Sequence, residues 1–542
     1  MDLNSSRTFL GISVIVLSSI LWLTWLEDHK PAPAISSPLT QGSSLEAANS
    51  TLGISSTSVA RLEESTGSDV RIETDMLSVR LNTHGGDISY VGLKQYDDKP
   101  GSQTPFPILV KDQQKFYAAQ SGLIGLNGPD TQNARAVWQS AASEYTMQPN
   151  AVEPLTVVLT WQAKGGLDIE KRYTFKPNHY DIEISYTIRN QGRDALSFSP
   201  YEVLKRTMPE QSGGFFSGGA SFVGAALSTP QKPYEKIGFD KMLKKPVDRL
   251  VEGGWISMQE RYFVTAWIPS NKQDNRYFSR VDAQSGVYSV GVFNPVLIVQ
   301  PGETITTSAL LFVGPERVDI LKGVAKGLDL TVDYGILWPV SQSLLWVLRG
   351  LYDVLGNWGW SIIALTILIK IVFYRFQSKA MRSMNALKQL QPKIEALRVS
   401  CGEDKVRFNQ EMMQLYKREK VNPMGGCLPL LIQLPVSIGI YYMLLESVEL
   451  RHAPFMFWIT DLAGKDPYYV VPILTAVTMW ILQSFSPKPT DPVQGTVLKT
   501  IPILLGFVAS QCPVGLGIYW VSNNLVSALQ QWLIMKRLDT AR

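Results

Sequence analysis

Cysteine and histidine are scarce in this chain of 542 residues. Its three cysteines, Cys401, Cys427 and Cys512, all lie in the C-terminal part, and its four histidines are scattered. The N-terminal part therefore has no disulfide framework, whatever its compartment. Too few histidines are available for a histidine-based metal site or a catalytic triad. We expect no metal, no other cofactor and no catalytic residues, so the chain is predicted not to be an enzyme.

A strong excess of charge of one sign is also absent. The chain has 51 Lys and Arg against 47 Asp and Glu, a formal net charge of +4. This balance gives no reason to expect nucleic-acid binding. The chain is too long for one ordinary domain. Roughly its first three hundred residues read as a soluble protein and its last two hundred as a membrane protein.

The N-terminus contains an apolar run from Phe9 to Leu26 that is long enough to span a bilayer. Charged residues follow it directly, and a Pro-, Ser-, Thr- and Ala-rich segment comes next. We therefore predict a transmembrane anchor in residues 1–26 and a flexible linker in residues 27–58. A cleaved signal peptide ending near Ala32-Pro33-Ala34 is the alternative.

Residues 59–325 alternate between apolar and polar side chains. The alternation is clear at 77–81, 155–161 and 182–188, and Gly-, Pro- and Asn-containing turns separate such runs. Many short strands of this kind predict an all-β sandwich. The Gly-rich segment 212–228 is expected to form a long loop. Four carboxylates could form an acid–base pair on a sugar-binding sandwich, but ordinary solvated side chains are the favoured interpretation: Glu202, Glu210, Asp240 and Glu260.

The segment Trp358 to Arg375, WGWSIIALTILIKIVFYR, reads as a membrane-spanning helix that contains one cation, Lys370. A charge inside such a segment costs about 2.5–3.5 kcal/mol on insertion scales, which makes Lys370 a functional candidate. Thr366 lies on the same helix face, four residues earlier. Before this span, residues 334–356 are typical of an amphipathic helix at the membrane surface, with Trp338 and Trp346 suited to the interface.

A charged stretch follows the span and carries 11 Lys and Arg against 5 Asp and Glu between Arg375 and Asn422. By the positive-inside rule this stretch is cytoplasmic. Apolar residues at helical spacing, interrupted by a turn at 400–404, predict a helical hairpin over residues 377–420. Pro392 is expected to kink its first arm. The hairpin residues that we single out are Met384, Leu387, Leu390, Pro392, Leu397, Phe408 and Met412.

Four further spans are predicted at residues 426–445, 467–483, 497–511 and 514–534. The loop 446–466 has four acidic and two basic residues, and the short tail 536–542 is basic. Residues 357–535 are therefore expected to contain five spans, and the chain is expected to cross the membrane six times with both termini in the cytoplasm. This topology places the β domain on the opposite side, which in a bacterium is the periplasm.

Polar residues on three of these spans fall in one layer. Counting 1.5 Å per residue puts all of them roughly 7–17 Å inside the cytoplasmic edge of the membrane. Two interpretations compete: hydrogen bonds that join helices, worth about 0.6 kcal/mol per pair, or a water-filled cavity open to the cytoplasm. No intramembrane Asp or Glu is available to pair with Lys370, which favours the cavity. The layer comprises Thr366, Lys370, Gln433, Tyr519, Asn523, Asn524 and Ser527.

A cavity of this kind could hold the polar end of another polypeptide while its apolar segment enters the lipid. Two other classes of function stay open. One is a small-molecule transporter, although no inverted repeat or second ionisable group supports it. The other is an envelope carbohydrate-binding protein that its helices only anchor.

Several long stretches resemble the YidC/Oxa/Alb family of membrane protein insertases, in the layout of Gram-negative members with a large periplasmic domain. They are LQPKIEALR (390–398), NQEMMQLYKREKVNPMGGCLPLLIQLPV (409–436), YYMLLESVELRHAPFMFWITDL (441–462), DPYYVVPIL (466–474) and PVGLGIYWVSNNLVS (513–527). The resemblance implies a supersandwich β domain and a hydrophilic groove open to cytoplasm and lipid. Lys370 stands where the family normally has Arg, and Arg375 replaces its usual Pro.

The resemblance also implies the partners and the location. Nascent membrane proteins enter the groove alone or from the Sec translocon, and the ribosome, the signal recognition pathway and membrane lipids are further expected partners. The location implied is the bacterial inner membrane. Tyr519 and Trp520 match substrate-contacting positions, and the remaining groove positions match Thr366, Gln433, Asn523 and Ser527.

Overall fold

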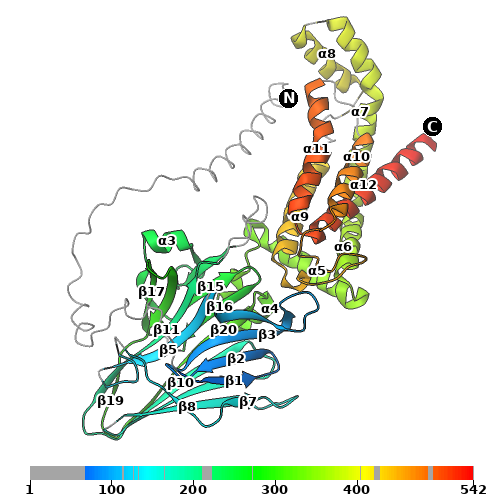
Figure 1. Ribbon diagram of the computed structural model, residues 1–542. Coiled ribbons are helices and arrows are strands. Elements are labelled where there is room, and N and C mark those ends of the chain that lie inside the picture. Colours follow the sequence, from blue (N-terminus) through cyan, green and yellow to red (C-terminus); the bar gives the residue numbers. More distant parts are fainter. Residues whose placement is uncertain are drawn as a thin grey trace.

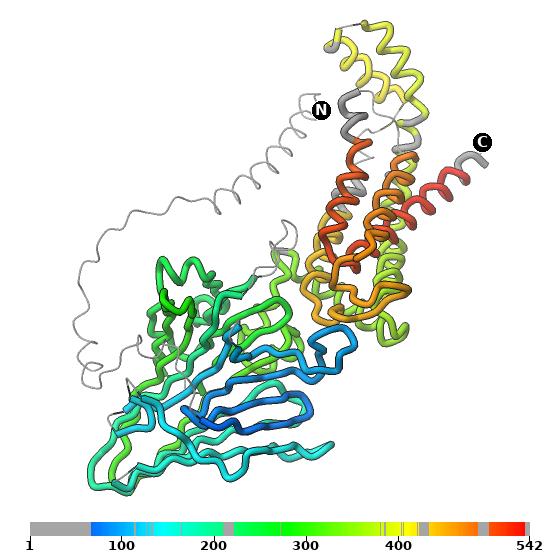
Figure 2. Tube along the Cα trace, viewed as in Figure 1, coloured from blue at the N-terminus to red at the C-terminus, as the bar shows by residue number. Residues whose placement is uncertain are grey.

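The chain folds into a β domain and a helical part that lie side by side (Figure 1). This computed structural model describes residues 67–112, 115–125, 127–131, 134–163, 165–209, 222–270, 273–402, 404–419, 421, 428–485 and 492–540. The predicted anchor, residues 1–26, and the predicted linker, residues 27–58, lie outside the described residues. The tube in Figure 2 follows the chain from the β domain into the helices.

The β domain consists of two large, mostly antiparallel sheets. In the larger sheet the strand order is β14-β17-β18-β11-β5-β4-β3-β2-β1-β7, and β19 pairs with β11. The smaller has the order β13-β12-β15-β16-β20-β10-β9-β8-β6. The strands are β1 (Asp69–Glu73), β2 (Leu77–Asn82), β3 (Asp87–Asp97), β4 (Pro105–Lys111), β5 (Phe116–Ile124), β6 (Gln139–Ser140), β7 (Glu144–Thr146), β8 (Leu155–Ala163), β9 (Leu167–Phe175), β10 (Asp181–Asn190), β11 (Leu196–Thr207), β12 (Gly224–Ser228), β13 (Glu235–Ile237), β14 (Asp248–Glu252), β15 (Trp255–Glu260), β16 (Phe263–Pro269), β17 (Asp274–Asp282), β18 (Val287–Phe293), β19 (Leu297–Val299) and β20 (Thr304–Pro315).

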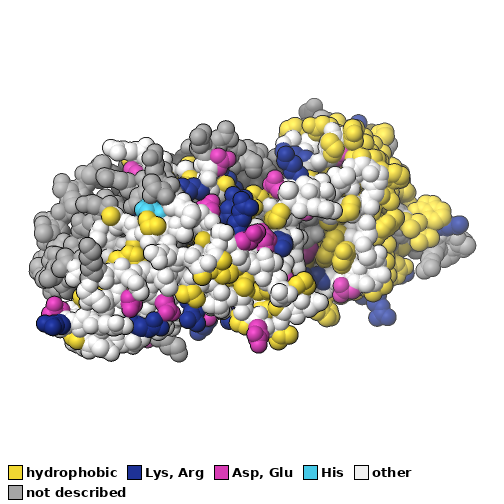
Figure 3. All heavy atoms as spheres, turned by 60° about the horizontal axis from the view of Figure 1, so that its bottom comes forward, with side chains coloured by type: hydrophobic (Ala, Val, Ile, Leu, Met, Phe, Trp, Pro, Cys, Tyr) yellow, Lys and Arg dark blue, Asp and Glu magenta, His cyan; other side chains and the backbone are white. Residues whose placement is uncertain are grey.

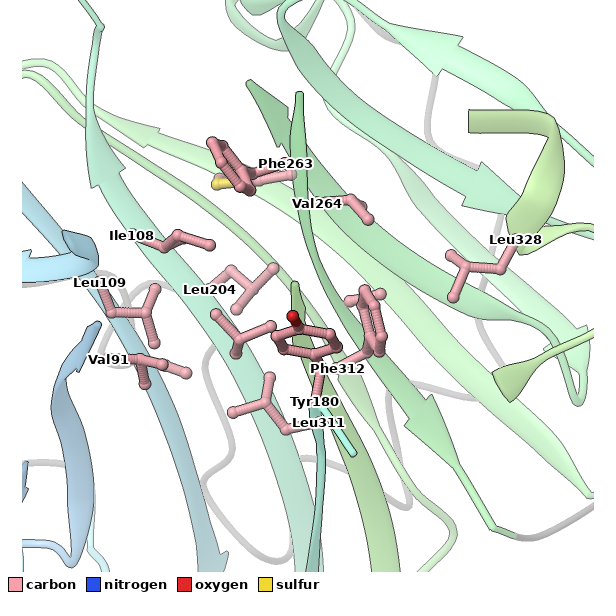
Figure 4. Close-up of a cluster of buried hydrophobic side chains, with 14 of the residues drawn as sticks. Val91, Ile108, Leu109, Tyr180, Leu204, Phe263, Val264, Leu311, Phe312 and Leu328 are labelled. Atoms are coloured by element: carbon pink, nitrogen blue, oxygen red, sulfur yellow. The ribbon is translucent and has the colours of Figure 1, made fainter. Parts of the chain in front are cut away.

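The core of the β domain lies between the two sheets. Val91 and Leu109 of the larger sheet and Val264 and Phe312 of the smaller are completely buried in one cluster (Figure 4). The strands predicted from alternation are present as β2, β8 and β10. In β10, alternate residues from Ile182 to Ile188, including Tyr186, are buried while Glu183, Ser185 and Thr187 are half-buried, as expected for a sheet with one covered face. The predicted all-β sandwich is confirmed.

The prediction of a long loop over residues 212–228 is wrong at its C-terminal end. Residues 224–228 form β12, all of whose side chains are buried. This strand pairs with both β13 and β15. The sequence GAALS lacks the β-branched residues that usually mark a strand, so pairing on both edges decides its conformation.

The carboxylate of Glu202 contradicts the expectation of solvated acidic residues. Glu202 is only 3% exposed, and Asn294 Nδ2 donates to both of its oxygens, at 2.9 and 3.0 Å. Burial raises the pKa of Glu202 to about 8, although the hydrogen bonds from Asn294 act in the opposite direction. Glu260 instead pairs with the buried Arg206 at 2.6 Å, and Asp240 is exposed. Glu210 lies outside the described residues.

Replacing Glu202 by glutamine is expected to change how stability depends on pH. The folded protein keeps the proton on Glu202 up to about pH 8, whereas the unfolded chain loses it near 4.5. The free energy of unfolding of the natural protein therefore falls as pH rises through this window, by at most about 1.4 kcal/mol per pH unit. In Glu202→Gln the contribution is absent, and its melting temperature should fall less between pH 5 and pH 8. If the melting temperatures of the two proteins fell by the same amount between pH 5 and pH 8, the assignment would be contradicted.

The helical part begins with short helices at the edge of the β domain and continues into long ones. α10 packs against α11 and α12, α12 packs against α6, and α5 packs against α6 and α9. Hydrophobic side chains are dense on the surface of this part, while charged side chains are more frequent on the β domain (Figure 3). The helices are α3 (Phe239–Lys244), α4 (Val318–Val324), α5 (Trp338–Leu355), α6 (Trp358–Val372), α7 (Tyr374–Cys401), α8 (Lys405–Arg418), α9 (Leu428–Glu446), α10 (Val470–Ser484), α11 (Pro492–Gln511) and α12 (Val514–Thr540), with 3₁₀ turns η2 (Leu328–Thr331), η3 (Gly335–Leu337) and η5 (Val448–Leu450).

The predicted amphipathic helix is present as α5. Trp346 is 78% exposed and Trp338 is 55% exposed, while Leu348 on the opposite side is buried. α5 ends at Leu355, and Gly356 directly after it adopts a left-handed conformation with φ of 66° that suits glycine. Asn357 then begins α6, because its side-chain oxygen accepts from the backbone N–H of Trp360. Its role is that of an N-cap.

Each predicted span after residue 357 corresponds to a helix, but the first is shorter than expected. α6 ends at Val372, and α7 starts two residues later after a bend of 61°. Among the described residues, no single helix has both the length and the apolarity of a membrane span. The bent pair Trp358–Val372 and Tyr374–Ser383 has the required length and apolarity only when the two helices are taken together. Val470–Ser484 and Leu498–Gln511 are shorter apolar helices.

The predicted hairpin consists of α7 and α8, which pack against each other. Gly402 follows α7, and Asp404 caps α8 by accepting from the N–H groups of Val406 and Arg407. α7 is one helix that continues through Pro392. Of the apolar residues singled out, Leu390 is buried, and Leu387, Leu397, Phe408 and Met412 are half-buried. The side chain of Met384 lies outside the described residues.

Arginines join the β domain to the helices. The Arg451 guanidinium donates to Asp97 O at 2.8 Å and lies 4.3 Å from the ring centre of Phe106. Arg261 donates to Leu445 O at the end of α9, at 3.2 Å. On α5, Arg349 forms ion pairs with Glu449 and with Asp319 of α4. These contacts attach the β domain to the loop after α9.

Candidate functional site

Lys370 occupies the last turn of α6, and its side chain is buried among helices. It is 5% exposed. Its ammonium Nζ donates to Ser527 Oγ of α12 at 2.8 Å and to Gln433 Oε1 of α9 at 3.4 Å. Both partners are neutral oxygens, and within the described ranges no carboxylate forms an ion pair with Lys370. The positive charge is therefore held by dipoles alone, which is costly in a low-dielectric setting.

The partners of Lys370 are themselves connected. Gln433 Nε2 donates to Asn523 Oδ1 at 2.9 Å, and Ser527 Oγ donates to Asn523 O at 2.6 Å. Because Gln433 uses its amide donor on Asn523, its oxygen points to Lys370. One hydrogen-bonded chain thus runs from α6 through α9 to α12.

The remaining residues of the predicted layer have other partners. Asn524 donates to Thr478 Oγ1 of α10 at 3.2 Å, and the Tyr519 hydroxyl lies 3.1 Å from Ser437 Oγ of α9. Thr366 donates to the backbone of its own helix, at Ile362 O. Trp520 is half-buried and packs against the apolar core. For Asn524 and Tyr519 the geometry fits hydrogen bonds that join helices.

A small pocket opens beside Lys370. Its cavity volume is about 20 Å³, which is room for about one water molecule. Its lining is mainly apolar, with three polar side chains among the seven lining residues, so it can hold a small polar group beside Lys370. Its lining residues are Ile369, Lys370, Phe373, Phe376, Gln377, Gln433 and Val436.

Three polar residues of this region were not singled out from the sequence. Ser437 lies one turn after Gln433, so a search for polar residues four apart on α9 would have found it. Thr478 lies in an apolar helix without a polar neighbour at such spacing, and only its contact with Asn524 distinguishes it. Gln377 belongs to the charged stretch after α6, where polar residues are expected and carry no signal.

Comparison with protein families matches almost the whole described chain. Residues 69–347 match the YidC periplasmic domain, and residues 350–541 match the 60Kd inner membrane protein. The chain belongs to the YidC family. The β domain is therefore the family's periplasmic domain, and the helical part matches the family's inner membrane protein.

Relatives in the YidC family extend over the full length of this chain. A membrane protein insertase YidC from Ectopseudomonas mendocina (strain ymp) is 38% identical, and the match covers 99% of both chains. Another membrane protein insertase YidC, from Coxiella burnetii (strain Dugway 5J108-111), is 38% identical over 99% of this chain and 97% of the relative.

Solved structures resemble the chain more distantly. An active YidC insertase with its first transmembrane domain resolved has a TM-score of 0.36 at 15% identity, covering 86% of this chain and 92% of that one. A galactose mutarotase related enzyme from Lactobacillus acidophilus has a TM-score of 0.31 at 9% identity, covering 45% of this chain and 97% of the enzyme.

Proposed function

We propose that this chain is a membrane protein insertase and membrane chaperone that inserts and folds integral membrane proteins. Full-length relatives of 37–38% identity that are named membrane protein insertase support the proposal. The single observation that carries it is the burial of Lys370 against neutral oxygens beside a mainly apolar pocket. An ammonium in this setting favours an incoming group with negative charge or a free carbonyl.

The proposed mechanism is a transfer of polar groups without bond chemistry. An acidic or polar group of the nascent chain reaches the pocket and accepts from Lys370, while the adjoining apolar segment moves into the lipid. Desolvation of the polar segment is then offset by hydrogen bonds, and a shorter distance of hydrocarbon remains to be crossed. Ser527 and Gln433 hold the ammonium in place when the pocket is empty.

The finer assignments are part of the same proposal. We place both termini and the α7–α8 hairpin in the cytoplasm, since the hairpin stretch is rich in Lys and Arg. Nascent membrane proteins are the proposed substrates, and some of them are proposed to arrive from the Sec translocon. The ribosome and the signal recognition pathway are proposed to approach from the hairpin side, and lipids surround the apolar surface of the helices.

A photocrosslinking amino acid at position 520 tests the proposal. Trp520 is half-buried on α12, one residue after Tyr519. We expect it to label nascent membrane-protein chains stalled during insertion. The matched control is the same amino acid at Trp346, which is 78% exposed on α5 and lies away from the pocket residues. Equal labelling from both positions, or none from position 520, would contradict the insertase function.

A further inference from the structure

Gln377 has a buried side-chain oxygen without a partner. The residue is 7% exposed, and its Oε1 forms no hydrogen bond. It lies in the first turn of α7, just after the bend that ends α6. A buried amide oxygen without a donor costs free energy, so such groups in native proteins usually have a reason to be retained.

The position of Gln377 supplies that reason. Its side chain lines the same pocket as Lys370 and Gln433. Of the described residues that line this pocket, Gln377 alone has a buried polar atom without a partner. The pocket therefore presents a donor at Lys370 and an unused acceptor at Gln377. A purely anionic ligand would satisfy only the first of these.

A peptide group at the opening of the pocket matches this pair of groups. Its carbonyl can accept from the ammonium of Lys370, and a backbone N–H can donate to Gln377 Oε1. Every polypeptide carries such groups whatever its sequence. The apolar lining residues Phe373, Phe376 and Val436 can contact the adjoining side chains.

We propose that Gln377 determines substrate binding by accepting a hydrogen bond from a backbone N–H of the transiting polypeptide. The inference rests on the proposed insertase function and specifies what the pocket recognises. Lys370 supplies the preference for acidic segments, and Gln377 supplies affinity for the backbone, which is independent of sequence. Together they allow one pocket to serve segments of different composition.

Two variants and two substrates test this inference in the full-length protein in proteoliposomes. The substrates are single-span proteins that differ only in whether the translocated segment is acidic or neutral and polar. In Gln377→Leu we expect insertion of both substrates to fall by a similar factor, about three- to tenfold. In Gln377→Glu, which keeps an acceptor, insertion of the neutral substrate should persist and insertion of the acidic one should fall.

Gln530 provides the matched control. It is also 7% exposed and its side-chain amide has no partner, but it lies on α12 and does not line the pocket. Gln530→Leu should therefore insert both substrates normally. Melting temperature separates binding from folding: Gln377→Leu loses no bond to the side-chain oxygen within the protein, so its melting temperature should not fall.

The outcomes are distinguishable. Normal insertion by Gln377→Leu, or a loss matched by a lower melting temperature, would overturn the role of Gln377. If Lys370→Glu still fails to insert the acidic substrate in that case, the insertase function stands without this inference. Normal insertion by both Gln377→Leu and Lys370→Glu would show that the pocket is not the substrate site.

Discussion

Insertion of membrane proteins with acidic translocated segments is expected to be lost when Lys370 is replaced by glutamate. The variant puts a carboxylate where the natural protein has an ammonium beside the pocket. A pair of unit charges about 4 Å apart interacts by about 4 kcal/mol at an effective dielectric of 20, so reversing its sign costs well over a hundredfold in binding. Insertion into proteoliposomes, followed by protease protection of the translocated segment, measures the effect.

Two further substitutions at Lys370 separate charge from folding. Lys370→Arg restores a cation, and we expect near-normal insertion if one donor can still reach Ser527. Lys370→Gln removes the charge and should reduce insertion of acidic segments more than that of neutral ones. Equal insertion of an acidic substrate by the natural protein and Lys370→Glu would show that the charge has no part in the function.

A large loss of stability is expected when Asp466 is replaced by alanine. Asp466 is 5% exposed. Its Oδ1 accepts from Trp458 Nε1 and from the backbone N–H of Tyr468, both at 3.0 Å, and its Oδ2 accepts from Val471 N at 2.7 Å. The carboxylate thus holds the loop before α10 and the first turn of that helix together. Alanine leaves three donors without an acceptor, which should lower the free energy of unfolding by about 3–5 kcal/mol.

The control for this prediction is Asp466→Asn. Its side-chain oxygen can still accept from Trp458 and Tyr468, but its amide nitrogen cannot accept from Val471. Unfolding in detergent should therefore place Asp466→Asn between the natural protein and Asp466→Ala. If the alanine variant melts at the natural temperature, Asp466 has no structural role at the start of α10.

Much of the fold could be predicted from the sequence because its signals are local. Alternation at 182–188 identifies a strand, and apolar length identifies the helices that became α9 to α12. Lys370 could be predicted as a functional residue because a single cation inside an apolar segment is costly and is rarely kept without a function. Depth counting along the spans placed it in one layer with Gln433 and Ser527.

The remainder depends on contacts between distant residues. The bond between Lys370 and Ser527 joins residues 157 positions apart, and counting depth cannot show which atoms meet. Glu202 was expected in solvent because nothing in the spacing of the acidic residues singled it out, but residues 198–206 of β11 are buried on both faces. The helix break after Val372 occurs within apolar sequence, so no residue type predicted it. Gln377 follows the break and was therefore not singled out as a pocket residue.

The bend between α6 and α7 has a mechanical consequence. Phe373, Phe376 and Gln377 form part of the wall around Lys370, and they also lie at or next to the start of α7, the long arm that ends at Cys401. The far end of this arm lies some 40 Å away at about 1.5 Å per residue, so a tilt of the arm about the bend would displace the wall at its near end. We therefore expect contact at the hairpin tip to alter the width of the pocket through α7, without any contact with the pocket itself.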